Sequence, residues 1–178
     1  MKTTLLRAFV LGAGLVAVPA LAQDSETFGV QTTVAPFCSE MTISSVPMNL
    51  GNLTGATGQV VNDFGGATES ERELAASFYC NAPSKVTITA DPLLNAGAPL
   101  ITDTTSFTNR VDYVATLHWD DVQGNDSSLE TAGEQITVGQ ANIGQMKIKL
   151  SDPTVANNKR PVAGDYAGQI HLTVALAQ

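Results

Sequence analysis

Apolar and polar residues alternate along most of the chain after residue 27. Alternation with a period of two is typical of a strand that buries one face, and the stretches between are rich in Gly, Asn, Asp and Pro, which favour turns. The pattern predicts strands over residues 28–34, 41–50, 74–80, 85–90, 111–119, 135–138, 145–150 and 166–176. Short strands spaced in this way predict an all-β antiparallel sandwich or barrel in a single domain.

The stretches between these strands are predicted to be loops. They comprise residues 59–70 (a loop or a short edge strand), 91–99, 120–128 (a polar turn) and 152–164. Residues 70–76 are ambiguous, because Thr68 with Glu71, and Ser70 with Glu73, match the capping box that begins a helix. We favour a strand here, since a helix of this length would be marginal. Its apolar face would carry Leu74, Ala76, Phe78 and Cys80.

The first 22 residues have the pattern of a secretory signal. Lys2 and Arg7 give a positive start, residues 9–18 form an apolar run, and residues 20–22 read Ala-Leu-Ala, a small-x-small cleavage site. The alternative is a transmembrane helix, but the run is too short to cross a bilayer and no second run follows. The sequence therefore predicts export, with no membrane insertion after the signal is removed.

Charge and composition narrow the functional classes. Removal of the leader would leave 156 residues, enough for one domain with a full core, and would change the formal net charge from −8 to −10. Nucleic acids and anionic membranes attract basic surfaces, so neither is expected as a partner. The chain has two His and two Cys and no G-x-S-x-G, H-E-x-x-H or phosphate-binding Gly-rich motif. We expect a protein that is not an enzyme and holds no metal or cofactor.

The two cysteines, Cys38 and Cys80, both lie in the exported part. In an oxidising compartment a single disulfide is the expected state, and it would close a loop of 43 residues. The alternative, a pair of redox-active thiols, normally uses a C-x-x-C motif, which is absent.

The predicted strand over residues 28–34 lies outside the disulfide loop and is joined to it through Pro36. It could be the domain's own first strand. It could also add to the open sheet edge of a neighbouring molecule, with its alternating side chains filling a gap there. Periodicity alone leaves both alternatives open.

Several stretches resemble spore-coat-U-like subunits of chaperone–usher fimbriae. The stretches are Phe28-x-Val30-x-Thr32-x-Val34-x-x-x-Cys38, Met48-x-Leu50-Gly51, Phe78-Tyr79-Cys80 and Pro161-x-Ala163-Gly164-x-Tyr166 followed by an alternating strand. The resemblance covers the mature chain as scattered motifs in a fixed order. Residues 94–144 do not align by eye, and the chain's last three residues, Leu-Ala-Gln, depart from the family's more apolar ending.

The resemblance implies an immunoglobulin-like, pilin-like sandwich that lacks its last strand. Residues 1–22 would be the signal, residues 23–36 an N-terminal extension and residues 37–178 the domain. A periplasmic chaperone would lend a strand during folding, and at an outer-membrane usher the next subunit's extension would replace it, giving a surface fimbrium that serves in cell adhesion. The donor residues would be Phe28, Val30, Thr32 and Val34, and the acceptor groove would be lined by Ile170, Leu172, Val174 and Leu176. The alternative function is a self-complete secreted sandwich that binds a glycan or a protein partner.

Two other clusters carry possible chemistry. Asp120, Asp121, Asn125 and Asp126 supply oxygen ligands but lack the spacing of a calcium loop, so a solvated hairpin turn is expected there. His118 and His171 alternate to the outward faces of their strands and are expected to lie on the surface. The charged residues Glu69, Glu71 and Glu73 are expected to form the solvated start of a strand.

Overall fold

The computed structural model describes residues 26–43, 46–64 and 70–177, which excludes the predicted signal at residues 1–22. The chain divides into two units between Val34 and Ala35. Residues 26–34 of the first unit have no regular secondary structure, so the strand predicted over residues 28–34 is wrong for the isolated chain. A strand exists only where a neighbour completes its hydrogen-bonded ladder, and the alternating pattern alone does not supply one.

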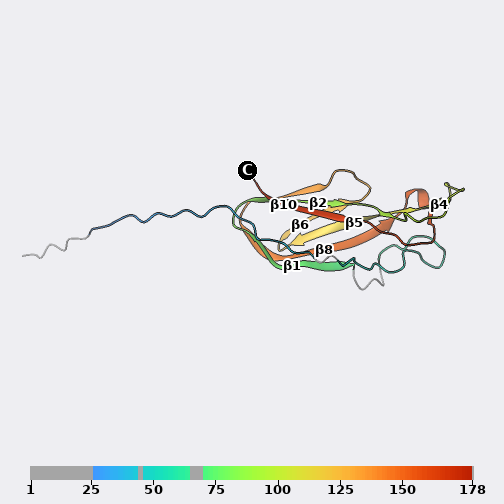
Figure 1. Ribbon diagram of the computed structural model, residues 1–178, viewed down its shortest axis with the longest axis horizontal. Helices are drawn as coiled ribbons and strands as arrows, with labels where there is room; N and C mark the ends of the chain where they lie inside the picture. Colours follow the sequence, from blue (N-terminus) through green and yellow to red (C-terminus); the bar gives the residue numbers. More distant parts are fainter. Residues whose placement is uncertain (1–25, 44–45, 65–69, 178) are drawn as a thin grey trace, which may run out of the picture. The chain divides into compact units, whose positions relative to one another are not determined.

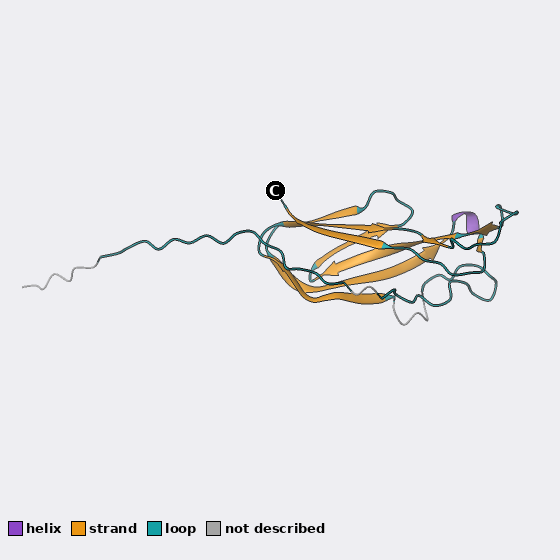
Figure 2. Cartoon of the chain, in the orientation of Figure 1, coloured by secondary structure: helices purple, strands orange, loops and turns teal. Residues whose placement is uncertain are grey.

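The second unit is an all-β domain, with no α-helix among the described residues (Figure 2). Its longer strands are β1 (Glu71–Cys80), β2 (Ser84–Ala90), β5 (Arg110–Trp119), β6 (Val122–Ser127), β7 (Glu134–Val138), β8 (Asn142–Thr154) and β10 (Ile170–Leu176). The two-residue strands are β3 (Leu93–Leu94), β4 (Phe107–Thr108) and β9 (Arg160–Pro161), and one 3-10 turn covers Ala156–Asn158.

The strands form two principal antiparallel sheets. One has the order β1-β8-β5, with β3 and β6 both pairing with β5, and the other has the order β10-β2-β7. A short parallel pair joins β4 to β9 at one end of the domain. Figure 1 shows β2 and β10 in one layer and β1 and β8 in the other. The predicted antiparallel sandwich is therefore confirmed.

The core fills the space between the two layers. Trp119 and Tyr113 of β5 are its largest fully buried side chains. The Trp119 Nε1–H donates to the Phe78 carbonyl oxygen at 3.1 Å, and the two rings meet edge to face at 5.2 Å. This pair ties β1 to β5 across β8, because buried aromatic rings favour such contacts and an indole N–H needs an acceptor.

One side of the sandwich is closed by β6 and β7, which contact each other. Gly124 of β6 lies against Ile136 of β7 so closely that a Cβ at residue 124 would overlap the isoleucine side chain. Asp126 of β6 is buried and accepts the Ala90 N–H through Oδ2 at 2.7 Å, which satisfies the last amide of β2. The polar turn predicted over residues 120–128 is thus wrong over residues 122–127, because β6 is a strand whose buried carboxylate, Asp126, has a main-chain partner.

Other expectations changed and one ambiguity was resolved. The strand predicted over residues 166–176 begins only at Ile170. Residues 71–80 form a strand, as preferred over the helix. The strand predicted over residues 41–50 is wrong, since none occurs among its described residues, although Met41, Met48 and Leu50 still pack against the core. The loop predicted over residues 152–164 is shorter than expected, because β8 continues to Thr154.

The predicted disulfide between Cys38 and Cys80 is present. Cys80 is buried at the end of β1, and Cys38 forms an isolated β-bridge with it. The Ser39 N–H donates to the Tyr79 carbonyl at 2.8 Å, and the Asn81 N–H donates to the Phe37 carbonyl at 2.9 Å. The start of the domain is therefore fastened to the end of β1 by covalent and main-chain bonds together.

Candidate strand-binding groove

The side of the sandwich opposite the β6–β7 contact is open. A cavity of about 1060 Å³ lies there, within the 35–178 unit, between β10 and the irregular segment 46–54. Its floor belongs to the core: Leu74, Leu93, Tyr113, Ile148 and Leu150. A concave site of this size with an apolar floor favours a ligand that brings several apolar side chains.

The β10 strand forms one wall and is the edge of its sheet. It pairs with β2 on one side, and no other described strand pairs with it on the other. The Asp91 N–H donates to the Gln169 carbonyl at 2.8 Å, and the Ala177 N–H donates to the Pro83 carbonyl at 2.9 Å. These two bonds fix which residues face β2, because hydrogen-bonded and non-bonded pairs alternate along an antiparallel ladder.

The alternation leaves every second residue of β10 turned toward the open edge. The odd-numbered residues, such as His171 and Thr173, are bonded to β2 through N–H and C=O. The even-numbered residues present their N–H and C=O groups to the open side. Their side chains point inward and are half-buried. They are Ile170, Leu172, Val174 and Leu176. An extended peptide laid along this edge would meet unpaired main-chain groups and apolar side chains together.

The opposite wall, residues 46–54, is held without a strand ladder. The Arg72 guanidinium of β1 donates to the carbonyl oxygens of Val46 and, at 3.1 Å, of Pro47. The Gly51 N–H donates to Asn49 Oδ1 at 3.0 Å, and Gly51 has a positive φ of 71°, which suits glycine. Local side-chain bonds thus shape this wall, leaving it separate from β10.

Tyr113 lies in the floor with its hydroxyl 3.5 Å from the Gln169 carbonyl oxygen. Burial raises the pKa of Tyr113 well above its usual value of 10.0, and the carboxylates of Asp91 and Asp126 add to the effect. The phenol is therefore neutral at physiological pH, and the floor of the groove carries no charge from it.

A tyrosine turn closes the groove where β10 begins. The Tyr166 hydroxyl donates to the Val162 carbonyl at 2.9 Å, four residues upstream, and burial raises its pKa. Gly164 has a φ of 139°, and a Cβ there would overlap the side-chain amide of Asn95. The glycine and tyrosine of the P-x-A-G-x-Y stretch are thus needed for this turn.

The predicted acceptor residues all lie on the inward face of β10, and Ile170 and Leu172 line the cavity, whereas Val174 and Leu176 lie beyond it. The predicted donor residues lie in the other unit. Phe28, Val30 and Val34 are 87%, 82% and 78% exposed, and Thr32 is exposed as well. Sequence reasoning missed the wall at residues 46–54 and the role of Arg72, since an irregular segment has no periodic signal.

The remaining candidate residues do not form a second site of similar size. Asp120 and Asp121 form the turn between β5 and β6, away from buried Asp126, and no described group of acidic, His or Cys residues could hold a metal ion.

The two histidines lie apart on the surface of their strands. The Nε2 atom of exposed His171 lies 3.1 Å from Asp91 Oδ2, and His118 lines a small polar pocket beside the Glu71–Lys147 ion pair. Glu73 is exposed on β1, and Glu69 lies outside the described residues. The described residues include no helix that is long and apolar enough to cross a membrane.

Comparison with known proteins finds no matching family model, no similar curated protein and no similar solved structure.

Proposed function

We propose that this protein is a structural subunit of a cell-surface fimbrium, assembled by donor-strand exchange. In this mechanism the N-terminal extension of one copy lies along β10 of another and fills its groove. The observation that carries the proposal is the open edge of β10, where four inward apolar residues also turn their main-chain groups outward.

The strand order supports an incomplete immunoglobulin-like sandwich. In that fold one sheet contains strands B, E and D, and the other contains G, F and C. Here β1-β8-β5 correspond to B-E-D, and β10-β2 correspond to F-C. The place of strand G, beside β10, is unfilled among the described residues. The Tyr166–Val162 hydrogen bond also matches the tyrosine corner that precedes strand F in such sandwiches.

The extension has the properties that the groove requires. Residues 28–34 span seven positions, the same length as β10, and their apolar members recur at every second residue. Both stretches extend over about 23 Å at the usual strand rise. Phe28, Val30 and Val34 are each more than three-quarters exposed, and exposed apolar residues that gather on one surface often mark a site of interaction. Thr32 is the weakest member of the series, since its hydroxyl gains least from burial.

The proposed pathway accounts for the unfilled groove. An unfilled groove exposes the core, so a periplasmic chaperone would cover it with a lent strand until an outer-membrane usher brings in the next subunit. The protein would accordingly be exported, pass through the periplasm and end at the cell surface. Its partners would be copies of itself or similar subunits, and its adhesive role would belong to the assembled fibre.

The test compares two neighbouring substitutions in the extension. The full chain is expressed in a bacterial periplasm with its chaperone and usher and examined on SDS gels without boiling. Val30→Asp places a carboxylate on the inward face and should abolish the boiling-sensitive ladder while leaving chaperone binding intact. Gln31→Asp carries the same charge on the outward face and should leave the ladder unchanged. Equal effects of the two, or a single monomer band from the unaltered chain, would rule out donor-strand exchange and favour a self-complete binding domain.

A further inference from the structure

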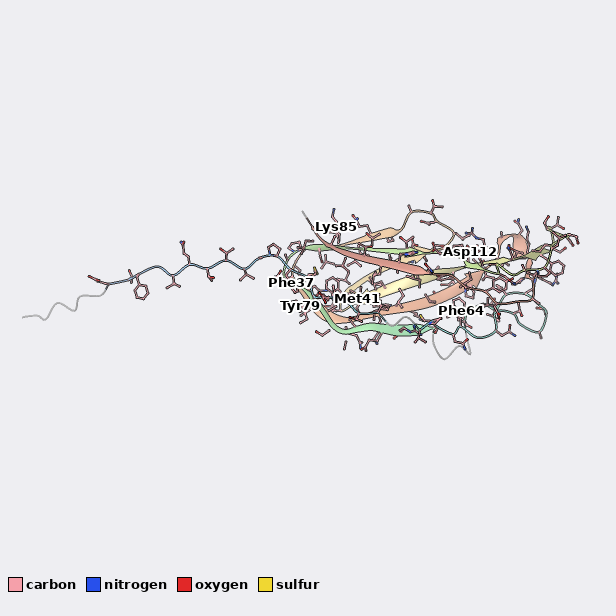
Figure 3. All side chains as sticks on the ribbon, in the orientation of Figure 1. Phe37, Met41, Phe64, Tyr79, Lys85 and Asp112 are labelled. Carbon is pink, nitrogen blue, oxygen red and sulfur yellow. A yellow bond between two sulfur atoms is a disulfide. The ribbon has the colours of Figure 1, made fainter. Side chains whose placement is uncertain are left out.

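A second apolar feature lies at the point where the extension joins the domain. Phe37, Tyr79 and Ile143 are 48%, 40% and 63% exposed. The rings of Phe37 and Tyr79 lie 5.9 Å apart, and Tyr79 of β1 is directly opposite Ile143 of β8 in the ladder. Figure 3 shows Phe37 and Tyr79 together at this end of the domain. We call these three residues the root patch.

The root patch begins directly after the extension along the chain and is fixed to the domain. Phe37 follows Val34 by three residues, and its main chain is bonded to Asn81, while the adjacent Cys38 is bonded to Cys80. Wherever an extension is bound, the root patch of the same copy must therefore lie within a few residues of the bound strand. One extended residue covers about 3.3–3.6 Å, so Phe37 lies at most about 10 Å from Val34.

The ladder register identifies the surface that it would meet. Leu176 pairs with Ser84 at the end of the domain that holds the root patch, whereas Ile170 pairs with Ala90 at the opposite end. Antiparallel pairing is the more stable kind, and every described ladder longer than two residues here is antiparallel. An extension bound antiparallel to β10 has its Val34 beside Ile170, so its root patch arrives at the opposite end of the acceptor.

A parallel arrangement would instead bring the root patch of one copy to the root patch of the next. The acceptor's own extension leaves at that place, so the two would compete for the same space. Antiparallel binding separates the arriving and departing strands and gives a head-to-tail contact that can repeat without closing. Exposed apolar side chains are present at the receiving end as well, namely Leu94, Leu100 and Phe107.

We infer that the root patch is a docking surface for a second copy of this chain, and that it seats against the end of the acceptor that carries Leu94, Leu100 and Phe107. This contact is separate from the donor strand and rests on the proposed function. It would set the angle between consecutive subunits, because a bound extension alone leaves a pivot between Val34 and Ala35, where the two units meet. Leu94 is the nearest of the three to the start of β10, since it exchanges main-chain hydrogen bonds with Ala167.

The test measures how fast the assembled full chain dissociates in urea, an uncharged denaturant that leaves ion pairs unscreened. Dissociation is followed as loss of the ladder on unboiled SDS gels. Ile143→Lys and Leu94→Glu should each speed dissociation about tenfold, which corresponds to losing one partly buried aliphatic contact. The double variant should return toward the original rate, because the new charges attract one another. Gln135→Lys is the control and should have no effect, because it adds the same charge on edge strand β7 opposite Thr87, the middle residue of β2.

A second measurement separates this inference from the proposed function. A synthetic peptide of residues 23–36 is titrated into the full chain carrying Val30→Asp, whose own extension cannot assemble. Peptide binding should be the same with and without Ile143→Lys, since the groove is untouched. Unchanged dissociation of the Ile143→Lys ladder alongside normal peptide binding would overturn the docking surface alone. Failure of the peptide to bind would overturn both the groove and the docking surface.

Discussion

The side-chain amide of Asn81 holds the main chain of Phe37. The Phe37 N–H donates to Asn81 Oδ1 at 2.6 Å, and Asn81 Nδ2 donates to the Ala35 carbonyl at 3.0 Å. One amide group therefore bonds the chain on both sides of Pro36, immediately before the disulfide. Since proline also fixes its own φ, the main chain over residues 35–37 is held in place at the start of the domain.

Asn81→Ala should destabilise the domain and loosen the start of the extension. Loss of two partly exposed hydrogen bonds should lower the free energy of unfolding by about 1 kcal/mol. Urea denaturation of the full chain measures this, with Asn125→Ala as the control, because Asn125 is an exposed residue of β6 whose side chain makes no hydrogen bond with the described residues. Equal urea midpoints for the two variants would show that the hydrogen bonds of Asn81 do not stabilise the domain.

The regular strands were predictable because their chemistry is periodic. Val86, Ile88 and Ala90 of β2 alternate with polar residues and are all buried, and the same pattern marks β5. The disulfide followed from the number and position of the cysteines. The alternation in β10 also indicated which of its residues face inward, and these turned out to be the ones at the open edge.

The errors arose where pairing or packing overrides composition. The β6 strand has the composition of a polar turn. It is held by the hydrogen bond that Asp126 accepts from a buried main-chain amide and by the close packing of Gly124. Neither contact leaves a periodic pattern in the sequence. Residues 41–50 alternate but contain Pro47 and are followed by a turn at Gly51, so they pack without a ladder. Residues 28–34 alternate without a partner in the isolated chain. The groove itself depends on which strands become neighbours, a property of topology that the sequence pattern does not contain.

Loss of the disulfide should be more costly than loss of any single hydrogen bond. Cys38→Ser with Cys80→Ser should lower the free energy of unfolding by about 4 kcal/mol, because the cross-link no longer restricts a loop of 43 residues in the unfolded chain. The urea midpoint of the double variant measures the effect, and the oxidised parent in the same buffer is the reference. A change below about 1 kcal/mol would mean that the main-chain bonds beside Cys80 hold this end unaided.

Tyr113 should make the domain sensitive to alkali. Its folded pKa is raised above the unfolded value of 10.0, so its contribution to stability is complete below pH 10 and is lost as pH rises further. Each tyrosine of this kind steepens the fall in unfolding free energy by up to about 1.4 kcal/mol per pH unit. Tyr113→Phe removes the ionisable group and should flatten the profile between pH 10 and 11.5 in urea titrations. Identical profiles for the two proteins would contradict the buried, neutral phenol.

Hydrogen exchange along β10 tests the central claim most directly. Amide exchange is run on the assembled full chain and on the unassembled Val30→Asp chain, quenched, and read residue by residue by NMR. The amides of His171 and Thr173, which face β2, should be protected in both samples. Those of Leu172 and Val174, which face the open edge, should exchange freely in the unassembled chain and become at least a hundredfold slower on assembly, as paired strand amides do. Free exchange of Leu172 and Val174 in the assembled fibre, or full protection in the unassembled chain, would show that no strand from another copy occupies this edge.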